Sequence, residues 1–194
     1  MTTGTSIGEC RERLKELLST CIQTGAITLS SGKTTDFYFD GRQVTLDPEG
    51  SVLVAELMLG EILARGIGAV GGLTSGADPI TSAVGVLAWQ RDVPLRLFFV
   101  RKERKEHGTR KSVEGPPLLG DGERAGPGSP RVALVDDVLT TGGSLLRARD
   151  GLVSDTGLTP ELAMVIVDRD EGGRERVEAE GLELVSLFHR GDFR

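Results

Sequence analysis

The residues best suited to chemistry lie in one string, from Val132 to Ser144. It reads Val-Ala-Leu-Val-Asp-Asp-Val-Leu-Thr-Thr-Gly-Gly-Ser, so an apolar strand leads to two adjacent acids, and a loop of small residues then opens a helix. Small residues let backbone N–H groups close around a phosphate, and a helix N-terminus adds partial positive charge. Asp136 and Asp137, directly before such a cradle, indicate a ligand that also carries hydroxyls. A ribose 5-phosphate meets both demands, with its phosphate in the loop and its 2- and 3-hydroxyls toward the acids.

Other interpretations of this string are weaker. A P-loop needs Gly-Lys-Ser/Thr after its glycine spacing, and a dinucleotide site needs Gly-x-Gly-x-x-Gly; the string contains neither. The ordinary alternative is a solvated strand end followed by a helix cap. A lone Gly-Gly pair would favour that alternative, but the whole string favours a phosphate site.

A second candidate is the basic run from Arg101 to Lys111, which directly follows an apolar strand. It reads Arg-Lys-Glu-Arg-Lys-Glu-His-Gly-Thr-Arg-Lys and holds six of the chain's 23 lysines and arginines against two acids. A pyrophosphate needs this density of cationic donors, because each phosphoryl oxygen carries charge that the site must neutralise. The alternatives are a solvated charged loop and a nucleic-acid patch. No aromatic residues interleave the run, and a net charge of −6 excludes a chain-wide nucleic-acid coat.

The elements that position these residues alternate along the chain. A capping box at Ser6 and Glu9 predicts a helix through Ile22, ended by Gly25, and a hairpin follows with strands at 26–29 and 37–40. Beyond these, we expect helices at 48–65, 79–90 and 143–153, and strands at 69–73, 95–100, 131–135, 162–167 and 182–187, with a short helix between the last two strands.

This alternation predicts an α/β fold, with a mostly parallel sheet flanked by helices on both faces. Ligands of such sheets bind beyond the carboxyl ends of the strands, so the loops after Leu73, Val100, Val135 and Val167 should surround one crevice. We expect one domain, residues 1–194, with a small hood formed mainly by residues 1–45 and a C-terminal contribution. The Gly/Pro-rich stretch 115–130 is expected to be a mobile surface loop.

The bulk properties indicate a cytoplasmic protein. Cys10 and Cys21 fall on the apolar stripe of the first helix, too far apart for a disulfide, and are predicted to be buried thiols in a reducing compartment. The N-terminus lacks a signal pattern, and no apolar run reaches the roughly 18 residues that a membrane span needs.

The string from Val132 to Ser144 resembles the motif that binds 5-phosphoribosyl 1-pyrophosphate (PRPP) in type I phosphoribosyltransferases. The resemblance implies that the two acids contact the ribose hydroxyls during catalysis and that the following loop holds the 5-phosphate. The PRPP-binding residues implied in this string are Asp136, Asp137, Val138, Leu139, Thr140, Thr141, Gly142, Gly143 and Ser144.

The basic run resembles the mobile catalytic loop of orotate phosphoribosyltransferases, through its Arg-Lys-x-x-Lys-x-His-Gly pattern. Hypoxanthine and adenine enzymes share the PRPP string but do not carry this loop. The resemblance implies that Arg101, Lys102, Lys105 and His107 bind the pyrophosphate, with Lys105 and His107 catalytic. It also implies a homodimer in which this loop reaches into the neighbouring subunit's active site.

Three further segments agree with that family. Ser31 to Asp40 resembles the hood whose aromatic residues flank the base. Ser30 stands where some members carry lysine, so Lys33 is the candidate cation toward orotate. Gly71 to Pro79 resembles the loop whose backbone meets pyrophosphate, although Asp78-Pro79 is also an ordinary helix start. Arg169, after the strand that ends at Val167, and Thr140 are the other implied orotate-binding residues.

The implied reaction joins orotate to PRPP and gives orotidine 5′-monophosphate and pyrophosphate, a step of de novo pyrimidine synthesis. The resemblance also implies Mg²⁺, carried by PRPP without a direct protein ligand, and small-molecule substrates rather than nucleic acid or membrane. One alternative is a phosphoribosyltransferase for another base, against which Arg169 counts because a purine has no carboxylate. The other is a PRPP-sensing regulator without catalysis, which the absence of an additional binding domain disfavours.

Overall fold

A central six-stranded sheet organises the protein. The computed structural model describes residues 6–28, 34–103, 111–120 and 124–193. The strand order is β5-β4-β3-β6-β7-β8, and every neighbouring pair is parallel except β4 with β5. The strands are β3 (Ala69–Leu73), β4 (Arg96–Val100), β5 (Val113–Glu114), β6 (Val132–Leu139), β7 (Leu162–Asp168) and β8 (Glu183–His189).

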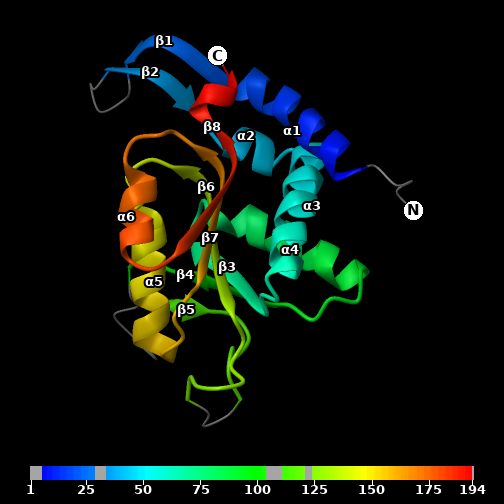
Figure 1. The fold of residues 1–194 in the computed structure, drawn as a ribbon, viewed down its shortest axis with the longest axis vertical. Helices are drawn as coiled ribbons and strands as arrows, with labels where there is room; N and C mark the ends of the chain where they lie inside the picture. The colour runs from blue at the N-terminus through cyan, green and yellow to red at the C-terminus, as the bar shows by residue number, and fades with distance from the viewer. Residues whose placement is uncertain (1–5, 29–33, 104–110, 121–123, 194) are drawn as a thin grey trace.

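Helices cover both faces of this sheet (Figure 1). On one face lie α3 (Pro48–Ala64) and α4 (Ala77–Gln90); on the other lie α5 (Gly143–Thr156) and α6 (Gly173–Ala179). Alternate residues of each strand enter two separate apolar clusters, because successive side chains of a strand point to opposite faces. Ala133 and Met164 join the cluster under α3 and α4, whereas Leu134 and Val165 join the one under α5. The predicted α/β fold is thus confirmed.

The hood lies above one end of the sheet (Figure 1). It contains α1 (Ile7–Cys21), an antiparallel pair made of β1 (Ile22–Thr28) and β2 (Thr34–Phe39), and α2 (Arg42–Thr45). The C-terminal 3₁₀ turn η1 (Arg190–Phe193) lies beside the pair, where Arg190 forms an ion pair with Asp36. Phe37 of β2 is buried, so its side chain anchors the pair on the main core.

The predicted boundaries in the hood were partly wrong. The first helix ends at Cys21 rather than beyond Ile22, and the first strand begins four residues before the expected Ala26. Gly25 does not end a helix: it lies inside β1 at φ +108°, beside a register shift between Thr24 and Ile27. A glycine with positive φ is typical of such a bulge, which the local pattern did not separate from a helix stop. Cys10 is buried as expected, but Cys21 is only partly buried.

Two differences bear on the candidate site. Strand β6 continues to Leu139, so the two acids lie within the strand and not just after the predicted end at Val135. The two-residue strand β5, which pairs with β4 at the edge of the sheet, was not predicted. No helix among the described residues is long and apolar enough to cross a membrane.

Candidate active site

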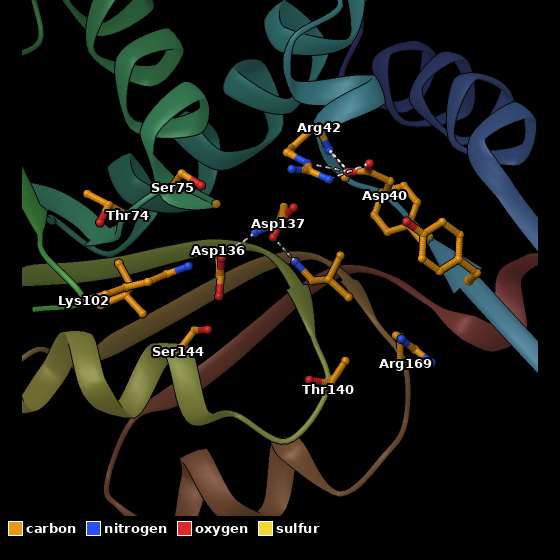
Figure 2. A pocket seen from close by; sticks show the side chains of 16 residues that line it. Asp40, Arg42, Thr74, Ser75, Lys102, Asp136, Asp137, Thr140, Ser144 and Arg169 are labelled. Atoms are coloured by element: carbon orange, nitrogen blue, oxygen red, sulfur yellow. Dashed lines mark hydrogen bonds and ion pairs between the residues drawn. The ribbon is translucent and has the colours of Figure 1, made fainter. Parts of the chain in front are cut away.

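A cleft of about 350 Å³ opens between the carboxyl ends of the strands and the hood (Figure 2). Its walls come from five separate segments, which include the loops after β3, β4 and β7 and the end of β6. The lining residues are Tyr38, Phe39, Asp40, Gly41, Arg42, Leu73, Thr74, Ser75, Gly76, Lys102, Asp136, Asp137, Val138, Thr140, Ser144 and Arg169. The crevice expected from the sheet topology is therefore present, and the hood supplies its second wall.

The acid pair lies in the middle of this cleft (Figure 2). Asp136 is only 7% exposed, and its Oδ1 accepts a hydrogen bond of 3.1 Å from the Asp137 N–H. Asp137 Oδ1 in turn accepts one of 2.9 Å from the Val138 N–H. Burial, and then the charge of Asp137, raise the pKa of Asp136 to about 7. At neutral pH, therefore, the pair can both accept and donate hydrogen bonds, as vicinal hydroxyls require.

Two glycines let neighbouring loops close on the acids. A Cβ on Gly41 of the hood would lie 2.6 Å from Asp137 Cβ and Oδ2, and a Cβ on Gly76 would lie 2.5 Å from Asp136 Oδ1. Real Cβ atoms essentially never approach this closely. The acids are thus held between the hood and the loop that follows β3.

Next to the acids, the small-residue loop encloses a hollow of about 190 Å³. Gly142 stands at the N-cap of α5 at φ +74°, and no side chain caps the helix there. The residues that line this hollow include Thr140, Thr141 and Ser144 and the start of α5, where the first N–H groups have no partner within the helix. A loop of this composition at a helix N-terminus suits an anion, and we call it the cradle. Leu139 also borders the cradle, and its side chain is buried in the core.

Lys102 extends from the end of β4 toward Asp136 (Figure 2). Arg101 is placed differently: it is not among the cleft-lining residues, and its Nε donates to Glu114 Oε1 over 2.8 Å. Of the three described cationic residues of the basic run, Arg101, Lys102 and Lys111, the structure therefore brings only Lys102 into the cleft. Lys105 and His107, together with the hood residues Ser30 and Lys33, lie outside the described residues.

Arg169 lies at the other end of the cleft and ties the sheet to the hood (Figure 2). Its Nη2 donates to the Phe37 carbonyl over 2.9 Å and lies 2.7 Å from Glu171 Oε1. The guanidinium carbon also lies 5.8 Å from the centre of the Phe37 ring. Arg169 is thus held against the hood, at the edge of the cleft.

Sequence reasoning did not single out Gly41 or Arg42 as site residues. Arg42 donates from Nε and Nη2 to the two carboxylate oxygens of Asp40, at 2.8 and 2.9 Å, and this pair lowers the pKa of Asp40. Glycine and arginine directly after the aromatic strand were the available signal, because a glycine there permits close approach. Thr74, Ser75 and Gly76 belong to a segment that the sequence did mark, and they line the cleft.

A separate group, Asp168, Asp170 and His189, has ligand atoms within 4.8 Å of one another, and it is the one such group among the described residues. Asp168 is almost fully buried, and its Oδ2 lies 3.2 Å from Arg174 Nη2, at ion-pair distance but without hydrogen-bond alignment. The charge of Asp168 is thus already partnered by a cation of the chain. We therefore interpret these three residues as a structural group that stabilises the end of β7.

The chain is similar to known orotate phosphoribosyltransferases. That of Rhodopseudomonas palustris (strain TIE-1) is 41% identical over 184 residues, which cover 94% of this chain and 95% of the relative. The crystal structure of Mycobacterium tuberculosis H37Rv orotate phosphoribosyltransferase in complex with PRPP superposes with a TM-score of 0.73, at 33% identity over 95% of this chain and 98% of the other. The same enzyme in complex with Fe(III) dicitrate gives a TM-score of 0.76 at 35% identity, with the same coverage of both chains. No protein-family model matches the chain.

Proposed function

The chain belongs to the orotate phosphoribosyltransferase family, and we therefore infer that it transfers the ribosyl 5-phosphate group of PRPP to orotate in pyrimidine biosynthesis. We propose that the cleft of Figure 2 is where this happens. The observation that carries the proposal is the order of groups along the cleft: Lys102 with Thr74 and Ser75 at one end, the acid pair in the middle, and Arg169 at the other end. Pyrophosphate, ribose and base follow one another in the same order in the reacting complex.

Each part of the substrates then has a partner. The 5-phosphate occupies the cradle from Thr140 to Ser144, and the ribose hydroxyls meet Asp136 and Asp137. Lys102 and the 74–76 loop receive the pyrophosphate, together with Arg101, Lys105 and His107 of the basic run. At the hood, Arg169 binds the carboxylate of orotate, with Thr140 and Lys33 as further contacts.

In this arrangement the base nitrogen attacks the anomeric carbon, and pyrophosphate leaves with inversion. Positive charge develops on the ribose and negative charge on the leaving group. The carboxylates of the acid pair stabilise the positive charge on the ribose, and the cationic side chains stabilise the negative charge on the pyrophosphate. No nucleophilic side chain is needed, so the protein acts through positioning and charge.

We propose Mg²⁺ as the metal, bound to PRPP and without a direct protein ligand. The acid pair fits such a complex, because a nearby cation would offset the burial and the charge of Asp137 that together raise the pKa of Asp136. The phosphate and ribose oxygens of PRPP are hard donors, which suit Mg²⁺ better than softer metals. When bound, the ion supplies charge neutralisation to the pyrophosphate oxygens.

We further propose a homodimer with shared active sites. An apolar groove of about 560 Å³ lies between α3 and α4. Leu46, Val52 and Val86 line this groove, and each of them is more than half exposed. Exposed apolar patches of this kind mark contact surfaces, and a second copy of the chain is the occupant that the proposed shared active site needs.

We also propose a cytoplasmic location, which the free thiols Cys10 and Cys21 support. The net charge of −6 supports small-molecule substrates rather than nucleic acid.

The reaction is tested by absorbance assay with orotate, PRPP and Mg²⁺, and with adenine, hypoxanthine and uracil as parallel acceptors. Consumption of orotate that requires all three components supports the proposal. Turnover with another base alone would keep the PRPP site and reject orotate. No turnover with any of the bases would instead favour a PRPP-binding regulator.

The shared site is tested by co-expressing Lys105→Ala and Asp137→Asn subunits. If the basic run acts on the partner's acids, each mixed dimer has one intact site, and random pairing restores about a quarter of wild-type activity. If both groups act within one subunit, the mixture stays as inactive as its parents.

A further inference from the structure

The two ends of the basic run are joined at the edge of the sheet. β4 and β5 pair antiparallel, with Val100 opposite Val113, and the Arg101 N–H donates to the Ser112 carbonyl over 2.9 Å. The Arg101–Glu114 ion pair lies beside this pairing. The run therefore leaves and re-enters the fold at one point, which we call its root: Val100, Arg101, Ser112 and Val113.

A single carboxylate holds one side of that root. Asp155 Oδ2 accepts hydrogen bonds from the Ser112 N–H, the Ser112 hydroxyl and the Val113 N–H, at 2.5, 2.9 and 2.9 Å. Ser112 is one of the few polar residues buried in the described part of the chain, at 4% exposure. Three donors that converge on one carboxylate oxygen fix the backbone at this point.

Asp155 belongs to α5, which is packed closely against the same root. A Cβ on Gly151 would lie 2.7 Å from Val100 Cγ1 and 3.0 Å from Ser112 Oγ. Helix α5 begins at Gly143, inside the phosphate cradle, and its last turn carries Asp155 (Figure 1). One rigid helix thus connects the residues that would hold the 5-phosphate to the residues from which the basic run departs.

We propose that Asp155 is a positioning residue for the transferase reaction. By fixing Ser112 and Val113, it sets the root of the basic run relative to the 5-phosphate cradle, and so sets where the run's cations meet the pyrophosphate. This inference rests on the proposed function of the run. A role in folding alone would predict an effect on stability but none on how the two ends of PRPP are bound.

The test compares Asp155→Ala and Asp155→Asn with wild type. Calorimetric titration with Mg²⁺–pyrophosphate and, separately, with ribose 5-phosphate measures the two ends of the site without catalysis. We expect Asp155→Ala to lower kcat by roughly 10- to 100-fold, because small displacements of reacting groups have effects of this size. Its affinity for pyrophosphate should fall about tenfold while that for ribose 5-phosphate stays within about twofold. Asn keeps one acceptor oxygen and should recover part of both losses.

Asp150→Ala is the matched control, because Asp150 lies on the same helix and its carboxylate pairs with Arg149 at the surface. Ser112→Ala removes only one of the three donors to Asp155, so it should give a smaller loss with the same pattern if Asp155→Ala folds poorly. Equal loss of both ligands, or wild-type pyrophosphate binding in both variants, would overturn the proposal. Failure of the proposed function is distinguishable, since it would appear as absent orotate turnover in the wild type itself.

Discussion

The two walls of the cleft are built in different ways. The sheet wall carries Asp136 and Asp137 on β6, with the cradle just after it. β6 is a central strand between β3 and β7, and its apolar residues other than Val138 are buried. The hood wall carries Tyr38 to Arg42, at the end of β2 and just beyond it, and β2 pairs only with β1 among the described residues. Ion pairs such as Arg42–Asp40 and Arg190–Asp36 secure that wall from the surface.

This difference matches the tasks that we assign to the two walls. Groups that stabilise developing charge must be fixed before the reaction, because reorganisation would consume the stabilisation. The buried β6 strand provides that fixity. The hood needs to select a base, which a few contacts at its edge can do. The walls touch through Gly41 against Asp137 and through Arg169 against the Phe37 carbonyl.

The largest effect should come from removing a charge on the sheet wall. Asp137→Asn keeps the size of the side chain and an oxygen for the Val138 N–H, but it removes the negative charge from the proposed ribose site. We expect kcat to fall by roughly 10²–10³, the usual loss when one preorganised electrostatic partner is removed. Steady-state kinetics with orotate and PRPP measures this. Asp150→Asn is the control, and a variant with near wild-type kcat would show that the acid pair is not at the reaction centre.

A charge removed from the hood end should act on binding instead. Arg169→Ala should raise the KM for orotate by roughly 10- to 100-fold, since a charge-assisted hydrogen bond contributes about 1.5–3 kcal/mol. The KM for PRPP should change little, because the cradle and the acids remain. Arg149→Ala, whose partners Asp150 and Glu180 lie on the surface, is the control. Equal effects on both substrates would contradict the division of tasks between the walls.

The sequence predicted the sheet wall better than the hood wall, for a physical reason. Along β6 and its loop, apolar residues, acids and glycines follow one another in the chain, so local pattern and site coincide. The crevice was predictable too, because parallel strands bring their carboxyl ends to one edge. In the hood, by contrast, Gly25 looked like a helix stop, and only its pairing partner reveals the bulge.

Other features depended on tertiary contacts that no local pattern contains. Gly41 is required by Asp137, almost a hundred positions along the chain. The raised pKa of Asp136 follows from its burial and then from the charge of Asp137. Strand β5 has only two residues, too few for a periodic signal, and it exists because β4 offers it an edge. Asp155 belongs to the same class, since its partners lie more than 40 residues away.

The contact between the walls can be tested at Gly41. Its backbone is right-handed helical (φ −57°, ψ −24°), which alanine adopts freely, so a Gly41→Ala effect must come from the 2.6 Å contact with Asp137. Displacement of Asp137 should lower kcat/KM for PRPP by about tenfold. Gly8→Ala, also in the hood and with only an ordinary contact at 3.8 Å, should leave kinetics unchanged. Wild-type kinetics in Gly41→Ala would mean that the hood can move away from the acids without an effect on activity.

The smallest effect concerns stability, and it depends on pH. Because the pKa of Asp136 is raised to about 7 in the folded chain, the folded state keeps a proton that the unfolded state has already lost above pH 4. The raised pKa therefore lowers the free energy of unfolding, by an amount that grows as the pH rises from 4 and reaches its full value above 7. Asp136→Asn removes this effect, so urea unfolding at fixed protein concentration should show a gain on the order of 1–3 kcal/mol at pH 8 and much less at pH 5. Asp150→Asn should show no such divergence. A stabilised but inactive Asp136→Asn variant would show that the buried acid lowers the stability of the fold and is required for activity. An equal gain in stability at both pH values would assign the effect to packing rather than to charge.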